Sequence, residues 1–105
     1  ASIKADTAYY YDKQKLWKLI GNVDIQNRKG ERFNTELLYW NEATQKVYSD
    51  KFIRIQQPDR VITGHGFDSN QQMTVYVIQN IEGIFYVDEN GGTAQPEVKA
   101  LPPVK

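Results

Sequence analysis

The stretch that decides the fold is Trp17-Lys18-Leu19-Ile20-Gly21-Asn22-Val23-Asp24-Ile25-Gln26-Asn27. Side chains in a strand alternate between the two faces of a sheet, so an apolar residue at every second position indicates a strand with one buried face. The odd positions here carry that apolar set: Trp17, Leu19, Val23 and Ile25. The same period of two returns in residues 47–56 and again in residues 73–77.

Turn-forming residues separate these stretches at short intervals. Clusters rich in Asn, Asp, Pro and Gly predict hairpin connections at residues 12–14, 27–30, 41–44, 58–60 and 68–70. No segment keeps a helical apolar period; the nearest, residues 34–40, is short and rich in aromatic residues, which favours a strand. The sequence therefore predicts an all-β domain built from antiparallel hairpins.

An internal repeat runs through the chain. Tyr10-Tyr11-Asp12 lies 29 residues before Tyr39-Trp40-Asn41, and residues 23–27 lie 30 residues before residues 53–57. A weaker third copy runs from Gly66 to Gly83. This pattern predicts a sheet that grows by stacking similar hairpins. Chance similarity between amphipathic hairpins is the alternative.

Length and charge limit the function classes. A chain of 105 residues fits one domain. The 13 Lys and Arg residues balance 13 Asp and Glu residues, so the chain lacks the basic excess that is typical of nucleic-acid binders. The absence of cysteine excludes disulfides and thiolate metal sites. The longest apolar runs have about four residues, far short of the roughly 20 in a membrane-spanning helix.

Composition divides the chain into two segments. Residues 1–87 carry the strand pattern and are predicted to form the folded domain. Residues 88–105 contain Gly91-Gly92 and three prolines, which predicts an extended or disordered tail.

Nothing in the sequence predicts catalysis, a metal or a cofactor. His65 is the single histidine and has no candidate catalytic partner nearby, so a structural role is favoured. Its neighbours Gly64 and Gly66 lie within a strand pattern, where glycine marks a bulge, a bend or a close backbone approach. The scattered carboxylates are interpreted as solvated surface: Asp24, Glu36, Asp50 and Asp68.

Clustered aromatic residues leave two interpretations. Tyr9-Tyr10-Tyr11 and Tyr39-Trp40 suit a platform on which sugar rings stack. They suit equally well a set of cross-strand pairs that fill a sheet. The structural interpretation is favoured because tyrosine and tryptophan are ordinary strand residues. Sugar binding remains the alternative function.

The in-phase apolar residues are the candidate binding site. Without helices to cover them, they must pack against another sheet or hold an apolar ligand. A sheet folded over on itself forms an apolar trough that suits acyl chains, and its unpaired edges invite strand addition. The predicted trough residues are Leu19, Val23, Ile25, Leu37, Tyr39, Val47, Ile53, Ile55, Val75 and Val77.

Several short motifs, in their order and spacing, resemble the OstA-like superfamily, and within it the chain is most similar to the LptC family. The motifs are Ala8-Tyr9-Tyr10-Tyr11-Asp12, Gly21-Asn22-Val23-Asp24-Ile25, Gly30, Thr35-Glu36-Leu37-Leu38-Tyr39-Trp40, Ser49-Asp50-Lys51-Phe52-Ile53-Arg54-Ile55, Thr63-Gly64-His65-Gly66-Phe67-Asp68 and Ile81-Glu82-Gly83. The resemblance covers about residues 5 to 86.

This resemblance implies a twisted, slightly open β-jellyroll without enzyme activity. It implies a periplasmic relay that binds lipopolysaccharide, holds the acyl chains in the trough and passes them toward the outer membrane. The implied partners are an LptA-like bridge protein and the inner-membrane ABC transporter complex, joined by edge-strand pairing. Anchoring at the inner membrane would need a segment that is absent from this chain. An LptA-type bridge shares the same repeat and stays open, as does a carbohydrate-binding or scaffolding β-domain.

Overall fold

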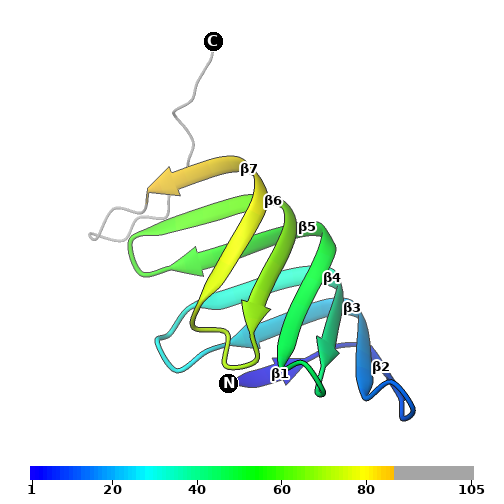
Figure 1. Cartoon of the computed structure of the whole chain (residues 1–105). Coiled ribbons are helices and arrows are strands. Elements are labelled where there is room, and N and C mark those ends of the chain that lie inside the picture. The colour runs from blue at the N-terminus through cyan, green and yellow to red at the C-terminus, as the bar shows by residue number, and fades with distance from the viewer. Residues whose placement is uncertain (87–105) are drawn as a thin grey trace.

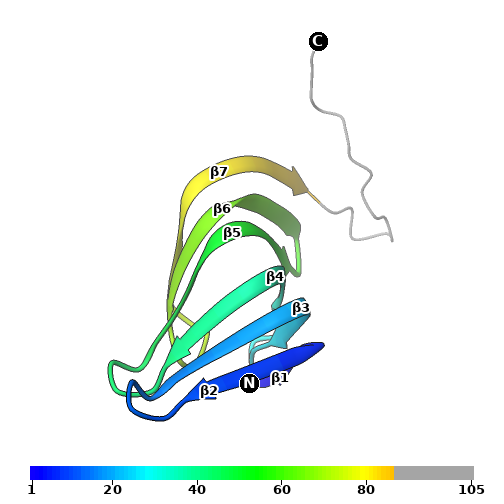
Figure 2. The same cartoon turned by 90° about the vertical axis from the view of Figure 1, so that its right-hand side faces the viewer.

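The computed structural model describes residues 1–86, and these form a single antiparallel sheet (Figure 1). The sheet order is β1-β3-β4-β5-β6-β7, and β2 pairs with β3 beside β1. Figure 2 shows the strands stacked from β1 and β2 at one end to β7 at the other. The strands are β1 (Ser2–Lys4), β2 (Thr7–Tyr11), β3 (Leu16–Gln26), β4 (Arg32–Asn41), β5 (Lys46–Gln57), β6 (Arg60–Asn70) and β7 (Tyr76–Tyr86).

A line of β-bulges creases this sheet. The pairing registers shift at Gly21-Asn22 on β3, at Asp50-Lys51 on β5 and at Glu82 on β7. A bulge adds one residue to one strand and bends it. Gly21 has a φ of 84° and Gly66, opposite the β5 bulge, has a φ of 85°, a conformation that glycine adopts without steric cost. The bulges recur at the spacing of the sequence repeat, so the repeat is also a repeat of bends.

The crease divides the long strands into two layers. Layer A, defined by its registers, contains β2, residues 16–20 of β3, 37–41 of β4, 46–49 of β5, 67–70 of β6 and 76–78 of β7. Layer B contains β1, residues 23–26 of β3, 32–35 of β4, 53–57 of β5, 60–63 of β6 and 83–86 of β7. Figure 1 shows the long strands turning over between the layers. The result is a slightly open β-jellyroll, as predicted.

The two layers pack directly on each other. The ring of Phe33 in layer B has its centroid 5.7 Å from that of Phe67 in layer A. The same Phe33 ring meets Tyr76 of layer A edge-on at 5.1 Å. Aromatic pairs favour these tilted and edge-on arrangements. The hydrophobic core is therefore the space between the layers.

Most predicted elements are confirmed, with one exception around residue 70. Residues 34–40 lie in β4 and the predicted turns up to residue 60 connect strands. The turn predicted at residues 68–70 is wrong, because β6 continues to Asn70. Residues 71–75 form the loop, so the strand predicted at 73–77 begins only at Tyr76. The Asn70 side chain causes this shift, since its Oδ1 accepts hydrogen bonds from the backbone N–H groups of Thr74 and Val75. The tail predicted at 88–105 lies outside the described residues.

Candidate functional site

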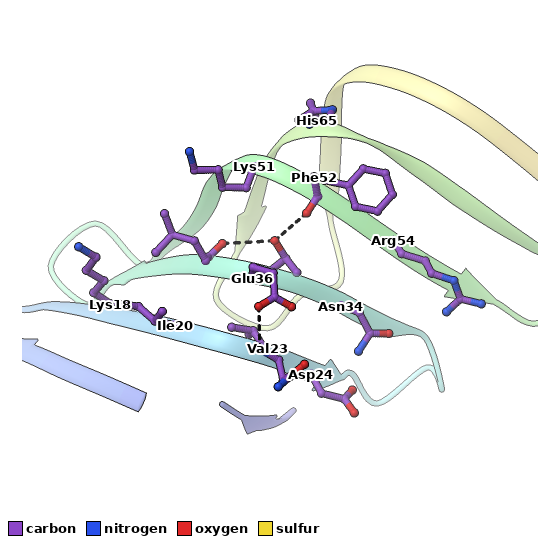
Figure 3. Close-up of a pocket in the computed structure, with 13 residues that line it drawn as sticks. Lys18, Ile20, Val23, Asp24, Asn34, Glu36, Lys51, Phe52, Arg54 and His65 are labelled. Atoms are coloured by element: carbon purple, nitrogen blue, oxygen red, sulfur yellow. Dashed lines mark hydrogen bonds between the residues drawn. The ribbon is translucent and has the colours of Figure 1, made fainter. Parts of the chain in front are cut away.

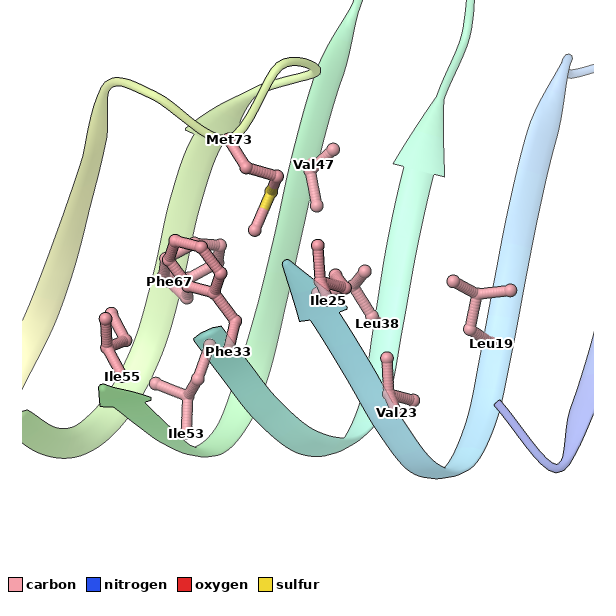
Figure 4. Close-up of a cluster of buried hydrophobic side chains, with 10 residues drawn as sticks. All are labelled: Leu19, Val23, Ile25, Phe33, Leu38, Val47, Ile53, Ile55, Phe67 and Met73. Atoms are coloured by element: carbon pink, nitrogen blue, oxygen red, sulfur yellow. The ribbon is translucent and has the colours of Figure 1, made fainter. Parts of the chain in front are cut away.

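The enclosed face between layers A and B is the candidate site. The hydroxyl residues Thr35, Ser49 and Ser69 are buried on this face, and ten apolar residues form its core (Figure 4). They come from both layers, so neither layer forms the interior alone. The set is Leu19, Val23, Ile25, Phe33, Leu38, Val47, Ile53, Ile55, Phe67 and Met73.

Six of the predicted trough residues lie in this core, and four do not. The six are Leu19, Val23, Ile25, Val47, Ile53 and Ile55. The predicted inward orientation is wrong for Leu37, Tyr39, Val75 and Val77. Val75 and Val77 are 70% and 60% exposed. Leu37 and Tyr39 are half-buried, and Tyr39 stacks on Tyr48 at 5.3 Å on the outer face.

The errors have two physical causes. On β4, Thr35 and Leu38 are both buried although they are three residues apart, so the crease shifts the phase of the strand by one residue. Leu38 is therefore enclosed and Leu37 is not. On β7, the loop at 71–75 resets the phase, and Tyr76 and Ile78 pack against the core while the valines on either side of Tyr76 face solvent.

The sequence prediction missed four core residues: Phe33, Leu38, Phe67 and Met73. Phe33 and Thr35 lie two residues apart and are both buried, and the same holds for Phe67 and Ser69. A period of two therefore did indicate the burial of the two phenylalanines. Leu38 required knowledge of the phase shift on β4. Met73 lies on a loop, where no periodicity predicts burial.

Polar contacts close the margin of the layers that lies opposite the crease. The β3–β4 loop (residues 27–31) ends layer B strands, and the β6–β7 loop (residues 71–75) ends layer A strands. Asn27 Nδ2 donates to the carbonyl oxygen of Met73 at 2.8 Å, and Lys29 Nζ lies 3.5 Å from the carbonyl oxygen of Thr74. We call these two contacts the clasp.

A second bridge crosses the same margin. Gln57 Nε2 at the end of β5 in layer B donates to Tyr76 Oη in layer A at 2.6 Å. Arg60 Nε donates to Gln57 Oε1 at 2.7 Å and so fixes the amide. Burial raises the pKa of Tyr76, so the phenol stays protonated and keeps its hydrogen-bonding capacity. The margin is therefore closed by hydrogen bonds, while the interior is mainly apolar.

A surface depression lies on the outer face instead (Figure 3). It has a volume of about 980 Å³, and its lining includes Ile20, Leu37 and Phe52. Charged side chains from Lys18, Glu36, Lys51 and Arg54 surround them. Most of these positions alternate with core residues along the strands, and the buried residues Val23 and Thr35 also contribute to the lining.

Aromatic residues form a row across β2, β3 and β4. The rings of Trp17 and Trp40 stack at 6.3 Å, and Tyr10 lies 4.7 Å from Trp17. Tyr10 Oη and Trp17 Nε1 both donate to the carboxylate of Glu42, at 2.9 and 3.2 Å. The hydrogen bond to Glu42 raises the pKa of the Tyr10 phenol. These rings contact one another as cross-strand pairs.

Two polar pairs, Arg32 with Asp24 and His65 with Glu82, lie partly exposed on the outer face. Arg32 donates two hydrogen bonds to Asp24, both at 3.0 Å, and they hold the pKa of that carboxyl below its ordinary value. His65 Nδ1 contacts Glu82 across the crease, and its ring meets Phe52 edge-on. Within residues 1–86, no three His, Cys, Asp or Glu side chains gather in a way that would hold a metal ion. No described helix has the length and apolar character needed to span a membrane.

A comparison with protein families identifies the chain. The profile described as "Lipopolysaccharide-assembly, LptC-related" matches residues 1–86, the whole described part. The chain belongs to the LptC family. Membership in the LptC family implies involvement in lipopolysaccharide transport in the periplasm, as an assembly component. No curated protein and no solved structure gives a significant match.

Proposed function

We propose that this LptC-family domain binds lipopolysaccharide with the acyl chains between layers A and B, and passes it to a neighbouring jellyroll on the way to the outer membrane. The observation that carries the proposal is an enclosed face built from ten buried apolar side chains of both layers, with the hydroxyl residues Thr35, Ser49 and Ser69 buried beside them. Acyl chains gain from leaving water in proportion to their buried area, while sugars and phosphates stay solvated. An interior shared by two layers offers such burial once the layers separate.

The free sheet edges support the proposed handover. Within residues 1–86, β7 pairs on one side with β6 and has no strand on its other side. Its exposed residues include Val77, Ile81, Ile84 and Tyr86. An unpaired apolar edge strand invites backbone pairing with another chain. The partners we propose are an LptA-like bridge protein and the inner-membrane ABC transporter complex, and we propose a position beside the inner membrane.

Site-specific photocrosslinking tests the lipid site. Benzophenone analogues of phenylalanine replace Phe33 or Phe67 on the enclosed face, and Phe52 on the outer face serves as the matched control. All three positions already hold a phenyl ring, but at Phe33 and Phe67 the added benzoyl group enters a packed interior, so folding is checked for each variant. Circular dichroism verifies folding, and the probe ligand is purified lipopolysaccharide.

We expect adducts at Phe33 and Phe67 and few at Phe52. Adducts at Phe52 alone would move the lipid to the outer depression and overturn the proposed site. A folded domain that forms no adducts at any of these positions would overturn lipid binding and favour the carbohydrate-binding or scaffolding alternative. That alternative predicts binding of delipidated polysaccharide that depends on Trp40.

A further inference from the structure

The enclosed face is already full. Side chains from both layers occupy it, and the rings of Phe33, Phe67 and Tyr76 meet across it. The depressions at the surface lie on the outer side of the strands. Protein interiors pack densely and tolerate extra volume poorly. An acyl chain that binds between the layers must therefore displace a side chain or force whole strands apart.

Met73 differs from every other member of the core. The other nine residues lie on strands β3 to β6, whereas Met73 lies on the β6–β7 loop. Its φ is 61°, in the left-handed region that is unfavourable for a residue with a Cβ. It is nevertheless 1% exposed. Figure 4 shows its side chain reaching from the loop into the cluster near Val47 and Phe67.

Few bonds hold Met73 in place. Its carbonyl oxygen accepts the clasp hydrogen bond from Asn27, and its N–H donates to the carbonyl oxygen of Asn70 at 3.1 Å. The Asn27 side chain is organised within its own loop, since its Oδ1 accepts from the N–H groups of Lys29 and Glu31 at 2.9 Å. Opening the clasp thus breaks contacts between two loops and leaves the strand ladders intact.

The chemistry of methionine suits exchange with a lipid chain. Its side chain is unbranched and flexible, with a thioether that behaves as an apolar group. A hydrocarbon chain has a similar width and the same preference for a dry interior. Replacing one by the other keeps the core filled. A strand-borne residue such as Phe67 lacks this freedom because its backbone is paired on both sides.

We infer that Met73 is a displaceable plug, and that the first acyl chain enters at the clasp, between residues 27–31 and 71–75, to occupy the place of its side chain. This inference rests on the proposed function and specifies which part of the enclosed face receives the lipid first. The clasp then reports the loaded state, because it is closed when Met73 is inside and open when the chain is inside.

The experiment uses the single methionine of the chain as a probe. A ¹³C label on the methionine methyl group gives one NMR signal from the domain, assigned by its loss in Met73→Leu. In the free protein the methyl group shares its cluster with Phe33 and Phe67, so ring currents shift its resonance. Lipid A is added to the wild-type domain, and binding is measured independently by crosslinking at Phe67.

We expect the methyl signal to move to the position of a solvent-exposed methionine at saturation with lipid A. Crosslinking at Phe67 with an unmoved methyl signal would overturn the plug and leave the proposed function standing. Absence of crosslinking would overturn both.

Two alanine variants separate a plug from a simple cavity. Met73→Ala removes the side chain that must leave, so we expect its dissociation constant for lipid A to fall about tenfold, equivalent to about 1.4 kcal/mol. Leu38→Ala creates space at a buried strand position of layer A and is the matched control, with no such gain expected. Equal gains in both variants would mean that any cavity improves binding, and would overturn the assignment of the plug to Met73. If either variant fails to fold, the methyl signal of the wild-type domain still decides.

Discussion

The two faces of the sheet carry similar types of residue but differ strongly in how far those residues are exposed to solvent. Both faces carry aromatic and aliphatic residues on alternating positions of the same strands. The ten core residues of the enclosed face are at most 6% exposed, while the outer face keeps large apolar residues exposed, among them Phe52 at 46% and Val77 at 60%. The larger depression lies on the outer face, yet its lining mixes charges of both signs with apolar groups. The position of the crease, rather than the type of residue, therefore decides which apolar side chains are buried in the core.

The largest difference in stability is expected between two ring truncations, one on the enclosed face and one on the outer face. Phe67→Ala leaves a cavity between the layers and should lower the free energy of unfolding by about 3–5 kcal/mol. Phe52→Ala removes an exposed ring with one edge-on contact to His65 and should cost less than about 1 kcal/mol. Urea denaturation of both variants measures the difference. Similar losses would mean that the two faces are not energetically distinct.

A methyl group placed at the crease should produce the next largest effect. In Gly64→Ala the new Cβ would overlap the carbonyl oxygen of Asn80 on the neighbouring strand β7, so β6 and β7 must separate locally. We expect a loss of roughly 1–3 kcal/mol in the free energy of unfolding. Gly30→Ala is the control, because its Cβ meets no atom and only its positive φ opposes the change. A smaller loss for Gly64→Ala than for Gly30→Ala would show that close strand approach does not maintain the crease.

A single hydrogen bond across the margin should have a moderate effect. Tyr76→Phe keeps the ring between Phe33 and Phe67 but removes the acceptor for Gln57 Nε2. We expect the free energy of unfolding to fall by about 1 kcal/mol, since an intramolecular hydrogen bond contributes about that much. Tyr86→Phe, at an exposed position of β7, is the control and should be nearly neutral. Thermal unfolding measures the midpoints of the two variants. Equal midpoints would contradict a stabilising role for the hydrogen bond between Gln57 and Tyr76.

The smallest effect concerns the ion pair on the outer face and depends on pH. Arg32 lowers the pKa of Asp24 below its ordinary value of 3.8, so the unfolded chain takes up the proton first as pH falls. The stabilisation is therefore complete above the ordinary value and is lost as pH falls through the lowered pKa. Both groups are partly exposed, so we expect Arg32→Gln to lower the free energy of unfolding only slightly at pH 7 and to have almost no effect in strong acid.

The control for this pair is Arg54→Gln, which removes an outer-face guanidinium that hydrogen-bonds Gln56 rather than a carboxylate. Urea denaturation at pH 7 and in strong acid compares the stability of both variants with that of the wild type. An Arg32→Gln penalty that persists in strong acid would assign the stabilisation to packing of the side chain instead of its charge.

Sequence patterns predicted the class of fold and part of the site. The period of two at Leu19, Val23 and Ile25 identified β3 and its inner face, and the same holds for Val47, Ile53 and Ile55 on β5. Prediction failed where the phase changes. The sequence pattern favours Leu37 over Leu38, because neither residue reveals that β4 crosses a crease between Thr35 and Leu38.

Sequence patterns alone predict strands and turns that repeat at a spacing of about 30 residues, because alternation and turn chemistry are local properties. The glycines at 64 and 66 were rightly interpreted as marks of a bend or a close approach. Only the tertiary structure decided which residues are enclosed, since that depends on where the bulges of neighbouring strands align. Met73 is the clearest case: its burial is set by a loop that reaches across to Asn27, 46 residues away in the chain, and no local pattern encodes such a contact.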